Sequence, residues 1–170
     1  MQITQPSRTS FTELEVVPKC HKWGGSLLLD GTGLDGATVL WAISGCESTF
    51  GANSKPRFEP SYARNMSPQM VALRNRLGDA SACSFGPWQL MAVNVTPSLE
   101  SVEQFADLDF CAAQTVNHIN LAILQAQGAK TLAQIADAYN SGNFRDKIVP
   151  TQYIADVVRY YDSYPMPVVA

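Results

Sequence analysis

The longest run of apolar positions predicts a helix that is buried on most sides. From about Ala37 to Cys46 nearly every position is apolar, and the run closes with Ser-Gly. A helix that is apolar all round its circumference is normally buried in a protein core. Glu47 would therefore lie at the C-terminal end of a buried helix.

Two later segments carry apolar residues at helical spacing between clear start and stop signals. The first has Ser67 as its N-cap, Pro68 in the first helical position and Gly78 as its stop. The second, longer segment runs from Asp107 to Gln127 and ends at Gly128. Both segments are predicted to be amphipathic helices.

Two further helices are predicted near the C-terminal end of the chain. One is capped by Thr131 and ends at an Asn-Ser-Gly sequence. The other starts near Thr151 and directs Tyr153, Val157 and either Tyr160 or Tyr161 toward the core.

Strand patterns are short, and the beginning of the chain shows little periodicity. Alternation occurs only at Ser26 to Leu29 and around Lys55 to Phe58, which predicts at most a small β-hairpin. Residues 1 to 35 contain several prolines and glycines and are predicted to form an irregular arm packed on the core. The expected fold is mainly α.

Length, composition and charge narrow the class of protein. The chain has 170 residues, of which 46% are hydrophobic and 16% charged, as expected for one domain spanning residues 1–170. The net charge of -3 with dispersed cations argues against nucleic acid as a partner. No stretch is long and apolar enough for membrane insertion, and the first residues lack the pattern of a signal peptide.

Cysteine and histidine spacing predicts neither a metal site nor a cofactor. Cys20, Cys46, Cys83 and Cys111 match no zinc-binding spacing, and they could be buried thiols or disulfides, including a Cys46–Cys83 bridge. His21 and His118 have no partners at metal-ligand spacing, so we expect surface or capping roles for both. The sequence also has no nucleotide-binding or G-x-S-x-G motif.

Glu47 is the most informative charged residue. A carboxylate at the edge of an apolar helix must be paired, protonated or displaced into solvent, because its desolvation is costly. The negative end of a helix also disfavours an ionised carboxylate and raises its pKa. A protonated carboxyl group at neutral pH would be suited to acid catalysis.

Four short motifs follow one another in a fixed order. They are Glu47-Ser48, S-F-G-P-W-Q-L-M at 84 to 91, A-Y-N-S-G at 138 to 142, and P-T-Q-Y at 150 to 153. This order resembles the soluble lytic transglycosylase and goose-type lysozyme superfamily over about residues 37 to 162. The resemblance implies a lysozyme-like α+β fold and cleavage of the glycan strands of bacterial peptidoglycan without a cofactor.

The resemblance also implies roles for individual residues. Glu47 would be the general acid, and Tyr139 would pack under it with its hydroxyl within reach. The expected substrate-binding residues are Ser48, Tyr62, Trp88, Gln89, Tyr139 and Asn140. For several of them a structural role is an open alternative: helix capping or surface polarity for Ser48 and Gln89, and core packing for Trp88, Tyr139 and Tyr153.

Glu59 is the leading candidate for a second catalytic carboxylate. Arg57-Phe58-Glu59-Pro60 resembles a stretch near the cleft of some muramidases, although Glu59 could instead pair with Arg57 or Arg64. Asp79, Asp107 and Asp109 are weaker candidates for this role. A lytic transglycosylase needs one acid, which favours a 1,6-anhydro product, whereas an inverting hydrolase needs a second carboxylate to activate water.

The chain departs from the family pattern in two places. The interval from Glu47 to Gly86 is long for the family. Pro150-Thr151 stands where many of these transglycosylases have Glu-Thr, so a carboxylate is missing there. The expected biology is a monomeric phage endolysin or virion-associated protein, made in the host cytoplasm without a signal peptide, that acts on the cell wall after release. The alternative of another class is a peptidoglycan-binding structural protein without activity.

Overall fold

A computed structural model describes residues 3–95, 99–125, 130–142, 148–163 and 166–167. Helices dominate this part of the chain and a small antiparallel sheet accompanies them, so the expectation of a mainly helical fold with little β-structure is confirmed. The α-helices are α1 (Glu13–Gly24), α2 (Gly36–Ser48), α3 (Pro60–Ala63), α4 (Pro68–Leu77), α5 (Leu108–Gln125), α6 (Leu132–Ser141) and α7 (Gln152–Ser163).

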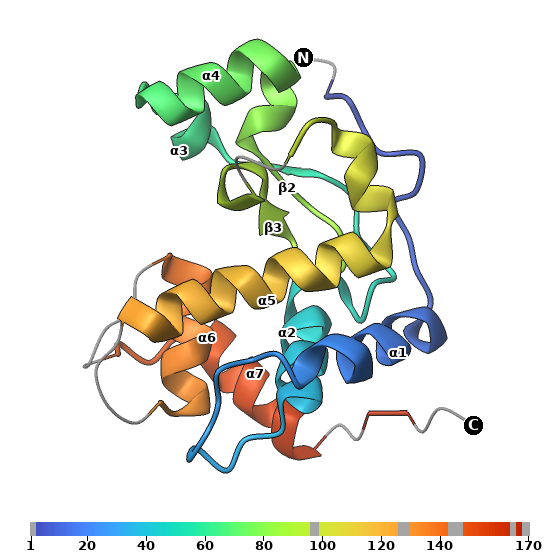
Figure 1. The fold of residues 1–170 in the computed structure, drawn as a ribbon, viewed down its shortest axis with the longest axis vertical. Helices are drawn as coiled ribbons and strands as arrows, with labels where there is room; N and C mark the ends of the chain where they lie inside the picture. Colours follow the sequence, from blue (N-terminus) through green and yellow to red (C-terminus); the bar gives the residue numbers. More distant parts are fainter. Residues whose placement is uncertain (1–2, 96–98, 126–129, 143–147, 164–165, 168–170) are drawn as a thin grey trace.

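Five helices pack together into what we call the helical body. Helix α2 contacts α1 and α7, while α5 contacts α1 and α6, and α6 packs on α7 (Figure 1). The side chains of Val39 to Ile43 are fully buried, which confirms the predicted burial of this helix on most sides. Glu47, in the last turn of α2, lies at the edge of the helical body next to residues of the small lobe.

The second part of the molecule, which we call the small lobe, contains the sheet. Strands β1 (Arg57–Phe58), β2 (Cys83–Phe85) and β3 (Leu90–Met91) are antiparallel in the order β1-β2-β3. Helices α3 and α4 lie at the far end of this lobe (Figure 1). The predicted strand around Lys55 to Phe58 is therefore present, whereas Ser26 to Leu29 forms no strand and follows α1 as a turn.

Helix α1 corrects the prediction of an irregular arm over residues 1 to 35. It begins with a capping box in which Thr12 and Glu15 bond reciprocally, and it contains Pro18 in its interior. A proline there removes the bond to the carbonyl four residues earlier, which belongs to Leu14, a residue with an exposed side chain.

The predicted helix ends are largely confirmed. Ser67 caps α4 by accepting a hydrogen bond from the Met70 amide, and Thr131 caps α6 in the same way through Gln134. Gly142 ends α6 with a left-handed φ of 72°. Helix α5 begins one residue after Asp107, and the end predicted at Gln127 and Gly128 lies outside the described residues.

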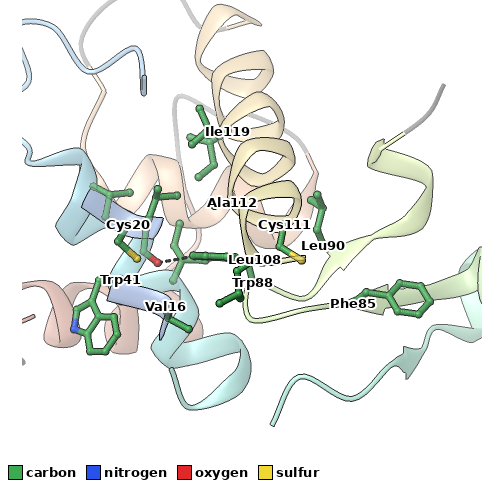
Figure 2. Close-up of a cluster of buried hydrophobic side chains, with 14 of the residues drawn as sticks. Val16, Cys20, Trp41, Phe85, Trp88, Leu90, Leu108, Cys111, Ala112 and Ile119 are labelled. Carbon is green, nitrogen blue, oxygen red and sulfur yellow. Dashed lines mark hydrogen bonds between the residues drawn. The ribbon is translucent and has the colours of Figure 1, made fainter. Parts of the chain in front are cut away.

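One cluster of buried apolar side chains runs through both parts of the molecule. Figure 2 shows Trp88 and Cys111 within this cluster, together with residues from α1 and α5. All four cysteines are free thiols, so the alternative of a Cys46–Cys83 bridge is not what the structure shows. Within the described ranges, we find no helix with the length and apolar character needed to cross a membrane.

Candidate active site

A pocket of about 240 Å³ brings together residues from the helical body and from the small lobe. Its wall is mainly polar and includes two carboxylates, one arginine and one histidine. The lining residues are Glu47, Arg57, Glu59, Tyr62, Ser84, Gln89, Leu90, Met91, Asn94, His118, Tyr139, Asn140 and Gly142. Glu47, Glu59, Tyr62, Gln89, Tyr139 and Asn140 are thus brought together as the sequence predicted, whereas Ser48 and Trp88 are absent from the wall.

Glu47 lies in the last turn of α2, and only 13% of its side chain is exposed. The pKa of its carboxyl group is raised from 4.5 to about 7; burial is the largest cause, and the nearby charge of Glu59 also raises the pKa. Tyr153 and Arg57 act in the opposite direction and lower the same pKa. The carboxyl group can therefore exist in either protonation state near neutral pH, as a group that donates and then accepts a proton requires.

The backbone turns sharply directly after Glu47 and Ser48. Thr49 and Phe50 adopt left-handed φ angles of 54° and 56°, which fold the chain back along α2. The ring of Phe50 then stacks on Trp41 with 4.2 Å between ring centroids. A Cβ at position 45 would lie 2.6 Å from that ring, so this fold-back needs Gly45.

Arg57 pairs with Glu47 and not with Glu59. Its Nη2 atom lies 3.6 Å from Oε2 of Glu47, and 47% of the arginine side chain is exposed. Glu59 stands at the N-cap position of α3 and faces the pocket. Among the described residues, Glu59 forms no ion pair with Arg57 or Arg64, so the alternative of such a pair is not supported.

Ser48 has a structural role, which corrects its expected contact with substrate. The side chain is buried, and its hydroxyl donates to the carbonyl of Pro87 at 2.6 Å. The same oxygen accepts a hydrogen bond from the amide of Gly51 at 2.8 Å. Ser48 therefore fixes the end of α2 against the turn between β2 and β3.

Trp88 is also structural, so the expected aromatic platform for a sugar is wrong. Its side chain is fully buried, and its indole N–H donates to the carbonyl of Leu40 at 2.8 Å. The alternative of core packing is the one that the structure shows. The residue after it, Gln89, is the one that turns toward the pocket.

Gln89 lines the pocket, but its amide group is already engaged within the protein. The side-chain oxygen accepts from the hydroxyl of Ser84, and the nitrogen donates to the carbonyls of Lys55 and Gly86. Its backbone has a φ of 46°, which is unusual for a residue with a side chain. These bonds hold the turn in place, so Gln89 shapes the pocket wall.

Two tyrosines flank Glu47 in a different arrangement from the expected one. The hydroxyl of Tyr139 donates to the carbonyl of Trp88 at 2.5 Å, so its hydrogen bond is not directed at Glu47. The hydroxyl of Tyr153 is buried and makes no hydrogen bond of normal geometry, yet it is close enough to lower the pKa of Glu47. Tyr153 is thus the hydroxyl neighbour of the carboxyl group.

His118 and Asn94 also line the pocket, although no sequence pattern marks them as site residues. Nδ2 of Asn94 lies 3.4 Å from Nε2 of His118, whose ring meets Tyr139 edge-on at 5.5 Å. Burial lowers the pKa of His118, so its imidazole is neutral at neutral pH. The expected surface role of this histidine is wrong: it lies at the border between the exposed Asn117 and the buried Ile119, a position that helical spacing alone cannot resolve.

The described residues contain no group of three or more His, Cys, Asp or Glu side chains that could hold a metal ion. Comparisons of the chain with protein-family models, curated proteins and solved structures found no match. What the pocket offers is a desolvated carboxyl group, a second carboxylate, and amide, imidazole and phenol groups. Neutral donors and acceptors of this kind suit a ligand with many hydroxyl or amide groups.

Proposed function

We propose that the protein degrades peptidoglycan by cleaving the β-1,4 bond between N-acetylmuramic acid and N-acetylglucosamine. In this proposal it acts as a lytic transglycosylase, with Glu47 as the general acid and then the general base. The observation that carries the proposal is the burial of Glu47 at the wall of a polar pocket, with its pKa raised to about 7. The order of motifs described above supplies the substrate class.

The proposed reaction uses both protonation states of Glu47. The protonated carboxyl group donates to the glycosidic oxygen as an oxocarbenium-like state forms at C1 of the muramic acid. The resulting carboxylate then accepts the proton of the C6 hydroxyl as that oxygen attacks C1 and closes a 1,6-anhydro ring. Glu47 ends in its starting state, and no water is consumed.

A second candidate function is hydrolysis of the same bond. It is favoured by the position of Glu59, which lines the same pocket as Glu47 and forms no ion pair among the described residues. A carboxylate in that position could activate a water molecule for attack on the opposite face of the sugar. The two functions use the same acid and differ only in the nucleophile.

The test is mass spectrometry of the fragments released from purified peptidoglycan by the wild type, Glu47→Gln and Glu59→Gln. The exposed Glu100→Gln variant serves as the control for loss of a carboxylate elsewhere. Transglycosylation predicts anhydro fragments from the wild type and from Glu59→Gln, and at least a hundredfold loss for Glu47→Gln. Reducing ends that disappear in Glu59→Gln would establish hydrolysis instead. No fragments from the wild type, despite binding to the wall, would leave a non-catalytic binding protein.

A further inference from the structure

Arg57 is the one permanently charged cation among the described residues that line the pocket. It belongs to β1, where its backbone pairs with Ser84 of β2, so the sheet fixes the base of its side chain. The guanidinium extends toward the helical body and reaches Oε2 of Glu47 at 3.6 Å. The two partners of this ion pair therefore come from opposite sides of the pocket.

The exposure of the two partners is unequal. The side chain of Glu47 is 13% exposed, whereas that of Arg57 is 47% exposed. Solvent that reaches the arginine weakens the pair, and at 3.6 Å the contact is longer than a normal charge-assisted hydrogen bond. Arg57 thus stabilises the negative charge of Glu47 without locking the carboxylate in place.

We propose that Arg57 is a positioning residue that keeps Glu47 available as a carboxylate, and that Glu59 opposes it. The role of these two charges in catalysis rests on the proposed function, in which Glu47 must be protonated for the first step and ionised for the second. The opposite effects of Arg57 and Glu59 on the protonation of Glu47 are a property of the folded protein. They can be measured without any substrate.

The remaining titratable neighbours of Glu47 are uncharged near neutral pH. Burial raises the pKa values of Tyr139 on α6 and Tyr153 on α7 well above the usual range of a phenol. Burial also raises the pKa of the Cys46 thiol to about 12 and lowers that of His118 on α5. Arg57 and Glu59 are therefore the charged groups that decide between the two protonation states of Glu47.

The two charges have opposite effects on the proton of Glu47. Loss of the Arg57 charge leaves the carboxyl group of Glu47 protonated to a higher pH. This favours proton donation in the first step, but it makes the carboxylate that acts as the base in the second step less stable. Loss of the Glu59 charge has the reverse effect, because one source of repulsion on the carboxylate disappears. Substitutions at positions 57 and 59 should therefore move the titration of Glu47 in opposite directions.

The test is an NMR titration of the protein carrying ¹³C-carboxyl glutamate, with the Glu47 signal assigned by its absence from Glu47→Gln. We expect Arg57→Gln to raise the midpoint of Glu47 by about 0.5–1 pH unit and Glu59→Gln to lower it. Arg57→Lys keeps the positive charge, so the midpoint of Glu47 should stay close to the wild-type value. Arg64→Gln, which removes an exposed cation that does not line the pocket, should leave the midpoint unchanged.

The proposal is overturned if Arg57→Gln leaves the midpoint of Glu47 unchanged or lowers it, in a variant whose amide spectrum shows the native fold. It is also overturned if Arg64→Gln shifts the midpoint of Glu47 as much as Arg57→Gln does, because the shift would then be caused by the change in net charge of the protein. On the activity side, the alkaline limb of the pH profile should move upward in Arg57→Gln, which a purely structural role would not cause.

Failure of this proposal and failure of the proposed function are distinguishable. If the midpoint shifts as expected but none of the proteins cleaves peptidoglycan, the assignment of Arg57 holds and the proposed function fails. If the wild type cleaves peptidoglycan but the midpoint does not respond to position 57, the proposed function holds and the assignment of Arg57 fails.

Discussion

Glu47 shows how a single residue can be unfavourable for folding and useful for chemistry. Its pKa of about 7 in the folded protein lies above the ordinary value of 4.5, because burial penalises the charged form. The folded state therefore holds a proton on Glu47 at a pH where the unfolded chain has released it. Between these two pKa values the folded state loses stability as the pH rises.

Glu47→Gln should therefore stabilise the protein at pH 8 and have little effect at pH 4. A difference of this size between folded and unfolded pKa corresponds to about 3 kcal/mol at high pH, and the neutral amide of glutamine does not carry this cost. Urea unfolding at both pH values measures the effect, with the exposed Glu100→Gln as control. Equal effects of Glu47→Gln at pH 4 and pH 8 would contradict a raised pKa.

At the residue scale, the sequence predicted which residues surround the pocket better than it predicted what they do. Glu47 could be selected from the sequence because a charge at the end of an apolar run is costly to bury, and such a cost is often found at functional sites. The family resemblance assigns Ser48 and Trp88 to the substrate, and this assignment fails because the direction of each side chain depends on the turns that follow α2 and β2. Thr49 and Gln89 have left-handed backbone angles in those turns, and no local sequence pattern predicts such angles at these residues.

At the element scale, the position of Glu47 depends on how the end of α2 is fastened. The hydroxyl of Ser48 satisfies two buried backbone groups, the carbonyl of Pro87 and the amide of Gly51. One of these belongs to the turn between β2 and β3, and the other to the chain that leaves α2. A single side chain thus joins the helical body to the small lobe next to the pocket.

Ser48→Ala should destabilise the protein by roughly 1–3 kcal/mol, because it leaves these two buried groups without a partner. Chemical unfolding measures the loss, and the exposed Ser61→Ala on α3 is the matched control, with an expected effect within about 0.5 kcal/mol. Activity per folded molecule should also fall, because the position of Glu47 depends on these bonds, although Ser48 does not line the pocket. A variant as stable as the wild type but unable to bind the glycan would restore the substrate role.

The elements themselves were predictable where their ends carry strong signals. Ser67, Pro68 and Gly78 bracket α4 as expected, and Thr131 starts α6. Helix α1 is absent from the predicted elements because the prolines and glycines of residues 1 to 35, including Pro18 inside the helix, favour irregular structure, although the helix begins with a capping box. Strand β3 has only two residues, too few for an alternating pattern to be visible.

At the scale of the whole molecule, Asp109 fastens α1 to α5. Its carboxylate accepts hydrogen bonds from Lys19 at 2.6 Å, and from Lys22 and the indole of Trp23 at 2.8 Å each. Lys19, Lys22 and Trp23 together hold the pKa of Asp109 well below its usual range. Stability from this group is present above the unfolded pKa of Asp and is lost as the pH falls through the lower folded value.

Asp109→Asn should lower stability at pH 7 by about 1 kcal/mol, since partial exposure of the group screens the interaction. The difference from the wild type should shrink as the pH falls below the ordinary pKa of Asp toward 2, because the unfolded wild-type chain then binds a proton that the folded protein does not. Unfolding midpoints in urea across this range measure the effect, with the exposed Asp30→Asn as control. A constant difference at every pH would show that the charge is not responsible.

The two hydrogen bonds made by Trp88, one through its carbonyl and one through its indole, have a consequence for fluorescence. Tyr139 on α6 donates to the carbonyl of Trp88, and the indole of Trp88 donates to Leu40 on α2. An indole shielded from water emits at shorter wavelength than one that water reaches. The buried indoles of Trp88 and Trp41 are therefore both expected to emit at short wavelength, and the contribution of Trp88 reports whether α2, α6 and the turn between β2 and β3 are packed together.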